Sequence, residues 1–244
     1  MKRFEDKVCI VTASATGIGL AIAEKMGQEG GKVVISSRNS KNIESAVKRL
    51  RAQNIICEGI ICHVAKDRKK LIDFTVEKFG KIDVLVNNAA VSTHFGPAMQ
   101  TPEDAYDKML NINVKSAFYL VKEALPHLKK TKGTVLFVSS VTAYDSIIDI
   151  GVYAMTKTAI LGITKTLAHE LGGFGIRVNA IAPGTIKTKF AAAIFENELA
   201  TKNVLGRVGE TKDVSGPAAF LCSEDAGFIT GETLMITGGA HARL

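Results

Sequence analysis

Short runs of apolar, largely β-branched residues alternate along the chain with longer segments in which apolar residues recur at helical spacing. Such runs are typical of strands buried on both faces, and they occupy residues 8–12, 33–35, 59–64, 84–86, 134–138, 177–181 and 233–236. The clearest helical segments cover residues 18–29, 42–52, 69–79 and 153–171. The alternation predicts an α/β fold, a doubly wound, seven-stranded parallel sheet with helices on both faces.

One domain covering residues 1–244 is expected, because no linker, repeat or low-complexity stretch divides the chain. The composition, 46% apolar and 23% charged, is that of a globular protein and excludes a disordered, collagen-like or disulfide-stapled chain. No apolar run approaches the ~20 residues that span a bilayer. The charged start of the chain is unlike a signal peptide, so we expect no membrane span and no secretion.

The net charge of +7 raises the question of a nucleic-acid partner. The densest basic clusters, residues 66–70 and 129–132, lack interleaved aromatic residues, and solvated helix faces explain them better. The four cysteines form no C-x-x-C pair, and the five histidines include no pair at i,i+4 spacing. We therefore expect no nucleic-acid partner, free thiols and no metal, whereas a positive field would still attract a phosphorylated cofactor.

The first predicted strand runs into a glycine-containing turn that opens the first helix, with the sequence Thr12-Ala13-Ser14-Ala15-Thr16-Gly17-Ile18-Gly19. Gly17 and Gly19 let the backbone come close to a ligand, and the helix N-terminus offers free N–H groups and the positive end of a dipole. A pyrophosphate suits this geometry. The turn therefore predicts a dinucleotide site.

The end of the second strand indicates which dinucleotide this site prefers. An acidic residue there would bind the ribose 2′-hydroxyl of NAD, but the chain reads Ser37-Arg38-Asn39 and has no acid before Glu44. The guanidinium fork of Arg38 suits a 2′-phosphate, which a carboxylate would repel. This pattern favours NADP(H).

Tyr153 and Lys157 are four residues apart in a helical segment, so their side chains share one face. A phenol with a pKa near 10 is a poor acid or base at neutral pH, and a nearby ammonium favours the phenolate. Charges ~4 Å apart at an effective dielectric constant of ~20 interact by about 4 kcal/mol, which corresponds to a pKa shift of up to about three units. We expect Lys157 to bring the Tyr153 hydroxyl toward the working pH, where general acid–base catalysis is most effective.

Further polar residues gather at the predicted carboxyl ends of the strands, where doubly wound folds bind ligands. Ser140 ends the fifth strand, Asn88-Ala89-Ala90 follows the fourth, Asn113 lies in the next helical region, and residues 183–188 follow the sixth strand. Together with the Y-x-x-x-K spacing, these motifs resemble the short-chain dehydrogenase/reductase family, and the resemblance covers nearly the whole chain.

The resemblance implies a Rossmann-like oxidoreductase with a Ser–Tyr–Lys triad and a supporting Asn. By that likeness Tyr153 passes a proton to or from the substrate oxygen, Ser140 hydrogen-bonds the same oxygen, and both contact the substrate. Lys157 would bind the nicotinamide ribose, and Asn113 would hold a water in the proton relay. The cofactor-binding residues it implies are Ala13, Ser14, Thr16, Gly17, Ile18, Gly19, Ser37, Arg38, Asn39, His63, Val64, Asn88, Ala89, Ala90, Tyr153, Lys157, Pro183, Gly184, Ile186 and Thr188.

Three positions depart from the family pattern. Ala13 and Ala90 replace glycines, and alanine fits either position if its backbone keeps a negative φ. His63 replaces the aspartate that usually meets the adenine, which puts that contact in doubt.

Within the family, residues 12–14, 36–38, 62–64 and 221–225 are similar to the peroxisomal NADPH-dependent carbonyl reductases. The likeness implies reduction of apolar carbonyl compounds (retinal, aromatic ketones, α-dicarbonyls), the reverse alcohol oxidation, and a homotetramer. Residues 92–97, 144–150 and 190–199 are the candidate walls of an apolar substrate pocket. Two alternatives stay open, a 3-oxoacyl-thioester reductase and a non-catalytic NADP(H)-sensing protein, although the latter typically lacks the Tyr or the Lys.

The last three residues, Ala242-Arg243-Leu244, fit the small–basic–leucine pattern that a peroxisomal import receptor reads. We expect a peroxisomal protein, or a cytoplasmic one if the tail is not read. The segment that begins at Tyr153 is apolar around most of its circumference, which is unusual for a helix packed on one side of a sheet. This pattern predicts symmetric association with further copies of the chain.

Overall fold

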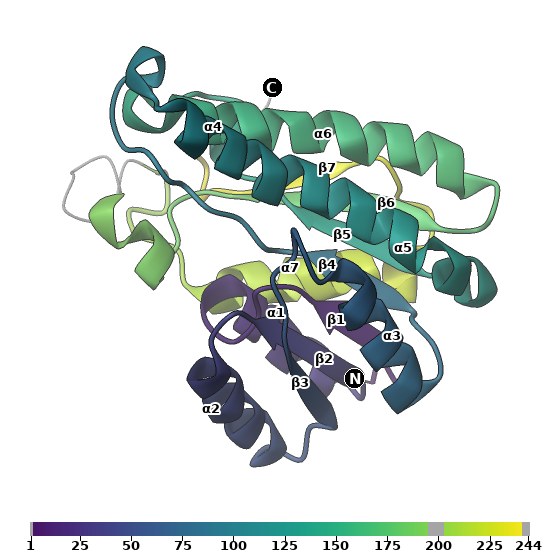
Figure 1. The fold of residues 1–244 in the computed structure, drawn as a ribbon. Coiled ribbons are helices and arrows are strands. Elements are labelled where there is room, and N and C mark those ends of the chain that lie inside the picture. The colour runs from purple at the N-terminus through teal and green to yellow at the C-terminus, as the bar shows by residue number, and fades with distance from the viewer. Residues whose placement is uncertain (1, 195–202, 241–244) are drawn as a thin grey trace.

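The structure, a computed structural model, describes residues 2–194 and 203–240. In this part of the chain all strands belong to one parallel, seven-stranded sheet, in the order β3-β2-β1-β4-β5-β6-β7 (Figure 1). The strands are β1 (Val8–Val11), β2 (Lys32–Ser37), β3 (Cys57–Ile61), β4 (Val84–Asn87), β5 (Thr134–Val138), β6 (Arg177–Pro183) and β7 (Thr233–Ile236). The order reverses between β1 and β4, which is the point where open α/β sheets bind ligands.

Helices cover both faces of the sheet, as the alternation of strands and helices predicts. The α-helices are α1 (Gly17–Gln28), α2 (Ser40–Arg51), α3 (Arg68–Phe79), α4 (Glu103–Met109), α5 (Ser116–Thr131), α6 (Gly151–Gly172) and α7 (Thr211–Cys222). A π-helical segment, η2 (Leu110–Lys115), joins α4 to α5. The short 3₁₀ segments are η1 (Ala98–Gln100), η3 (Val141–Ala143), η4 (Ile148–Ile150), η5 (Lys189–Ile194) and η7 (Glu224–Ala226).

Two apolar cores lie on opposite faces of the sheet because side chains alternate along each strand. On β1, Cys9 and Val11 join α1, α2 and α7 in one core, whereas Ile10 joins α3, α5 and α6 in the other. Figure 1 shows the same division, with α5 and α6 on one side of the strands and α1 and α7 on the other. The fold predicted from the sequence is confirmed.

The third strand differs from its predicted range of residues 59–64. It begins earlier, at Cys57, and ends at Ile61, so His63 and Val64 lie in a loop rather than in a strand. The reason is its neighbour: β2 ends at Ser37, whose partner in the ladder is Ile61. Because β2 offers no further partner beyond Ser37, β3 ends at Ile61 and the chain turns there.

No helix among the described residues is long and apolar enough to cross a membrane. In the same part of the chain, His, Cys, Asp and Glu side chains form no cluster of three or more that could hold a metal ion.

Candidate active site

The turn between β1 and α1 leaves backbone N–H groups free at the start of a helix. Thr16 caps α1 without a hydrogen bond from its side chain, and the first turn of the helix contains no acidic residue. Gly17 has a φ of +61°, a conformation that favours glycine. At Gly19 an added Cβ would lie 2.5 Å from Asn88 Nδ2, so the helix and the β4 loop can approach only because this side chain is absent. These features make a cradle for an anionic group.

Ala13 lies in the left-handed region, with a φ of +49°. The condition under which alanine fits this position, a negative φ, is therefore not met at Ala13, whereas Ala90 does avoid positive φ. The turn imposes this conformation because the Ala13 carbonyl accepts a hydrogen bond from Asn88 Nδ2 at 3.2 Å. The chain thus carries a Cβ at a position where a glycine would be unstrained.

Thr12 joins the ends of β1 and β4. Its hydroxyl accepts hydrogen bonds from the backbone N–H groups of Asn88 (2.9 Å) and Ala89 (3.0 Å), and the Asn88 amide donates to the Thr12 carbonyl at 2.9 Å. Ser14 is buried, donates to the Val11 carbonyl and accepts from Ser36 N at 3.1 Å. Ser14 therefore supports the turn from behind and does not face a ligand.

The residues after β2 lie at the same edge of the sheet but outside the main cleft. The Ser37 hydroxyl accepts from Asn39 N at 3.2 Å, and the Asn39 side chain caps α2 by accepting from Asn42 N at 3.1 Å. Arg38 is exposed and forms no ion pair with any described residue. Its guanidinium is thus available to a ligand.

Ser140, Tyr153 and Lys157 come together where β5 ends and α6 begins. Tyr153 and Lys157 lie on one face of α6, with Lys157 Nζ 5.5 Å from the centroid of the tyrosine ring. Lys157 Nζ donates a hydrogen bond to the Val138 carbonyl at 2.7 Å. The Ser140 side chain acts on the Tyr153 hydroxyl by lowering its pKa, and the Ser140 hydroxyl accepts from Thr142 N at 3.2 Å and from the Thr142 hydroxyl at 2.9 Å. The residues that the Y-x-x-x-K spacing and the strand ends indicated thus form one cluster.

The protonation of this cluster differs from the sequence-based expectation. Burial raises the pKa of the Tyr153 hydroxyl, and the hydrogen bond with Ser140 opposes this only in part. Burial also lowers the pKa of the Lys157 ammonium to about 7. The expected lowering of the Tyr153 pKa by Lys157 is absent, because the charged forms of both groups lose solvation. Tyr153 is therefore protonated at neutral pH, and Lys157 titrates there.

Asn113 connects three segments that are far apart in the sequence. Its carbonyl oxygen accepts from Val91 N at 2.8 Å, and its amide donates to the Val91 carbonyl at 2.8 Å and to the Thr156 hydroxyl at 3.0 Å. Thr156 in turn donates to the Tyr153 carbonyl at 2.7 Å. Asn113 thus fixes the loop after β4 and η2 against the turn of α6 that carries Tyr153.

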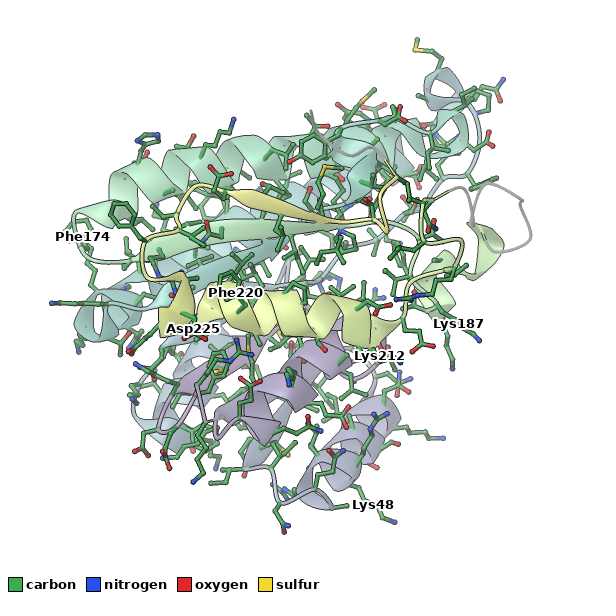
Figure 2. All side chains as sticks on the ribbon, turned by 180° about the vertical axis from the view of Figure 1, so that it is seen from behind. Lys48, Phe174, Lys187, Lys212, Phe220 and Asp225 are labelled. Carbon is green, nitrogen blue, oxygen red and sulfur yellow. The ribbon has the colours of Figure 1, made fainter. Side chains whose placement is uncertain are left out.

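A cleft of about 890 Å³ opens at the carboxyl edge of the sheet. Many of the site residues expected from the sequence line it: Ala13, Thr16, Gly17, Ile18, Asn88, Ala90, Ser140, Tyr153, Lys157, Pro183, Gly184, Ile186 and Thr188. Others lie beside it or behind it: Ser14, Gly19, Ser37, Arg38, Asn39, Ala89 and Asn113. Two, His63 and Val64, lie in the loop after β3. Figure 2 shows Lys187 at this end of the molecule, opposite Asp225 and Phe174.

Each candidate wall segment contributes apolar side chains to the cleft. Phe95, Ile147 and Phe190 line it, and the Phe190 ring lies 5.8 Å from the Tyr153 ring, centroid to centroid. Residues 195–199 of the third wall, like the tail Ala242-Arg243-Leu244, lie outside the described residues.

Sequence reasoning missed several residues of the cleft. Thr185 and Lys187 line it; they belong to the segment 183–188 that was expected at this edge, but they were not named as site residues. The predicted residue Thr188 faces Gly17 across the cleft, 3.6 Å from where a Cβ would lie. Ser139 is buried and donates to the Lys157 carbonyl at 2.9 Å. The signal for all three residues is their position at a strand end, Ser139 beside Ser140 and Thr185 and Lys187 after the sixth strand.

Comparison with known proteins places this geometry in a family. A family model described as "Enoyl-(Acyl carrier protein) reductase" matches residues 12–241. Tropinone reductase-like 3 of Erythroxylum coca is 48% identical over 250 residues, covering 100% of this chain and 96% of the relative. Dehydrogenase/reductase SDR family member 4 of Homo sapiens is 44% identical over 247 residues, covering 98% and 89%. The protein of that name from Caenorhabditis elegans is 44% identical over 255 residues, covering 100% and 98%.

Solved structures show the same fold. A 7α-hydroxysteroid dehydrogenase in complex with NADH and 7-oxo glycochenodeoxycholic acid has a TM-score of 0.92 and 29% identity, covering 98% of this chain and 96% of its own. A short-chain type dehydrogenase/reductase from Mycobacterium ulcerans has a TM-score of 0.92 and 30% identity, covering 97% and 90%. The chain therefore belongs to the short-chain dehydrogenase/reductase family and is a pyridine-nucleotide-dependent oxidoreductase.

Proposed function

We propose that the protein is an NADPH-dependent carbonyl reductase that reduces apolar carbonyl compounds such as retinal, aromatic ketones and α-dicarbonyls, and that also oxidises the corresponding alcohols. The observation that carries this proposal is the grouping of Ser140, Tyr153 and Lys157 in a cleft with apolar walls. The similarity to dehydrogenase/reductase SDR family member 4 and to Tropinone reductase-like 3 supports it.

The protonation of the cluster supports the reductive direction. Carbonyl reduction needs a proton at the substrate oxygen, and the raised pKa of Tyr153 keeps its hydroxyl protonated at neutral pH. Ser140, whose side chain lies close enough to Tyr153 to influence its pKa, would donate to the same oxygen and hold it in place. Lys157, with a pKa of about 7, can then return a proton to Tyr153 near neutral pH. The Asn113 side chain is engaged by Val91 and Thr156, so it would position the helix turn of Tyr153, and the relay water expected at Asn113 would not bind this side chain.

The start of α1 fits the pyrophosphate of a dinucleotide, because its N–H groups are free and Gly17 leaves the approach open. When bound, NADPH supplies the hydride that the reaction adds to the carbonyl carbon. Thr188 faces the same turn, and the unpaired guanidinium of Arg38 would hold the 2′-phosphate.

Replacing Tyr153 with Phe removes the proton donor and keeps the ring. We expect turnover of a diketone or retinal to fall at least about a hundredfold, while NADPH still binds with near-normal affinity in a fluorescence titration. Near-normal turnover in the variant would refute the role of Tyr153.

Assaying the wild-type protein with acetoacetyl thioester tests the alternative, because a 3-oxoacyl-thioester reductase prefers that substrate. NADPH binding without turnover of any carbonyl compound would favour the sensing protein.

Replacing Arg38 with Glu tests the cofactor preference. A carboxylate would repel the 2′-phosphate and accept a hydrogen bond from a free 2′-hydroxyl. We expect the Michaelis constant for NADPH to rise far more than that for NADH. An equal change in both constants would contradict the proposed preference for NADP(H).

Two further parts of the proposal concern the whole protein. The tail Ala242-Arg243-Leu244 would be read by a peroxisomal import receptor, and the protein would then act in the peroxisome. We also propose a homotetramer, which the half-exposed apolar and aromatic residues Met155, Phe118 and Tyr119 on α6 and α5 support.

A further inference from the structure

The Ser140 hydroxyl accepts two hydrogen bonds from the same residue. Its oxygen caps η3 by accepting from the Thr142 backbone N–H at 3.2 Å, and it also accepts from the Thr142 hydroxyl at 2.9 Å. A serine hydroxyl has one proton to donate and two lone pairs with which to accept. Because Thr142 occupies both lone pairs, the proton is the group that Ser140 has left to offer to the cleft.

The two bonds from Thr142 make different demands on the sequence. The backbone N–H at position 142 would donate to Ser140 with any residue other than proline there, since such capping bonds need only the backbone. The second bond needs a hydroxyl at this position. Thr142 supplies it from a side chain that is only 5% exposed, where water competes little for the bond. Thr142 therefore gives Ser140 a bond that the fold of η3 does not itself provide.

The direction of the Ser140 proton matters because Tyr153 lies beside it. The Ser140 side chain lowers the pKa of the Tyr153 hydroxyl, which is the effect of a group that donates to the phenolate. With a free lone pair, Ser140 could instead accept from Tyr153 and hold the phenol proton away from the substrate. The bond from Thr142 fills that lone pair, and a hydroxyl that accepts a hydrogen bond also becomes a stronger donor.

We propose that Thr142 is a positioning residue for the reaction: its hydroxyl fixes Ser140 as a donor, so that Ser140 and Tyr153 both direct their protons at the carbonyl oxygen of the substrate. This inference rests on the proposed carbonyl reduction. Thr142 acts through Ser140, so it affects the chemical step. It leaves NADPH binding unchanged, because the pyrophosphate cradle lies at the start of α1.

Thr142→Val removes the hydroxyl and keeps a branched side chain. The measurement is the single-turnover rate of NADPH oxidation by a diketone in a stopped-flow experiment, which is independent of product release. We expect the rate at saturating diketone to fall about three- to tenfold, as for the loss of one neutral hydrogen bond. The half-saturating diketone concentration and the dissociation constant of NADPH should stay within about twofold. Thr142→Ala should behave like Thr142→Val, and Thr142→Ser, which keeps the hydroxyl, should restore the rate.

Thr158→Val is the matched control, because it removes another threonine hydroxyl that bonds η3. Thr158 Oγ1 donates to the Ala143 carbonyl at 3.1 Å and so holds η3 against α6 without a bond to Ser140. We expect this variant to keep the wild-type rate. A similar loss of rate in Thr158→Val and Thr142→Val would overturn the proposal, because loosening of η3 would then explain both.

Ser140→Ala tests whether Thr142 acts through Ser140. In this background Thr142→Val should slow the single turnover no further, because the lone pairs that Thr142 occupies are gone. An equal loss in both backgrounds would overturn the proposal and indicate that Thr142 contacts the substrate itself.

A Thr142→Val protein as fast as the wild type, or faster, would also overturn the proposal. A faster variant would show that Ser140 donates to Thr142 in the wild-type protein. Either result would leave the proposed function standing. A wild-type protein that binds NADPH and reduces no carbonyl compound would refute the proposed function, and with it the inference that rests on it.

Discussion

The left-handed backbone of Ala13 costs stability at the phosphate-binding turn. An L-residue with a Cβ loses about 1–2 kcal/mol in this conformation, whereas glycine adopts it freely. Ala13 has a φ of +49°, so Ala13→Gly should relieve that strain. After the larger entropy loss of glycine on folding, we expect a gain of about 0.5–1 kcal/mol, seen as a rise in melting temperature of roughly 2 °C.

Ala90→Gly is the matched control for this prediction. Ala90 is the other alanine that replaces a family glycine, but its φ is not positive. Glycine there should only add conformational freedom to the unfolded chain and lower stability by about 0.5–1 kcal/mol. Equal effects of the two substitutions, measured by calorimetric or urea-induced unfolding, would contradict the explanation by backbone strain.

Lys157 should make the stability of the protein depend on pH. Its pKa is about 7 in the folded chain, against 10.5 as the ordinary value. Between these values the unfolded chain holds the proton and the folded one does not, so the free energy of unfolding rises with pH. The loss of stability that comes from burying the Lys157 ammonium is fully present below pH 7 and disappears as pH approaches 10.5. The slope should approach about 1.4 kcal/mol per pH unit.

Urea unfolding between pH 7 and 8.5 measures this slope. The four buried thiols, whose raised pKa values begin to lower stability about one unit below the ordinary value of 9.0, oppose this slope toward pH 8.5, so it is read as the difference from Lys157→Met. The positive slope should be lost in Lys157→Met and persist in Lys165→Met, which changes an exposed lysine of the same helix. A wild-type protein whose stability is flat over this range would show that the ammonium is not desolvated.

At the scale of elements, the sequence predicts the strands and helices whose bounds are set by the residues of the element itself. The strands at residues 134–138 and 233–236 have the predicted bounds, because apolar β-branched runs there end at polar or glycine residues. The end of β3 is not predictable in the same way, because it depends on where the neighbouring β2 ends. Ser140, Tyr153 and Lys157 could be brought together from strand ends and helical spacing alone.

The π-helical segment η2 could not be predicted from the sequence, because it lies beside contacts with residues far away along the chain. Its widened turn, with the Ser116 N–H bonded to the Asn111 carbonyl, lies beside the bonds from Asn113 to Val91 and Thr156. Those partners are 22 and 43 residues away, so local propensity carries no trace of them. The protonation of Tyr153 was missed for a similar reason: the spacing gives the distance to Lys157, but burial is a property of the packed site.

At the scale of the whole molecule, the face of α6 turned away from the sheet has no partner among the described residues 2–194 and 203–240. Met155 and Gly162 are exposed on this face, and an added Cβ at Gly162 would meet no atom within 4 Å. Glycine inside a helix lowers its stability by about 1 kcal/mol relative to alanine. Within a single chain, no contact of Gly162 among the described residues offsets this loss. A bare backbone does allow a helix of another subunit to approach closely, which favours α6 as part of the interface of the proposed tetramer.

Gly162→Glu should therefore break the assembly and leave the subunit folded. A charged side chain has room within one chain but would be buried without a partner between two. In sedimentation velocity we expect the wild-type protein to run as the proposed tetramer and the variant as a smaller species, with an unchanged circular dichroism spectrum. Gly173→Glu, at the end of the same helix where a Cβ also meets nothing, should leave the mass unchanged. A Gly162→Glu protein that keeps the mass of a tetramer would place the interface elsewhere. A monomeric wild-type protein would refute the proposed tetramer, because the exposed face of α6 would then have no partner in solution either.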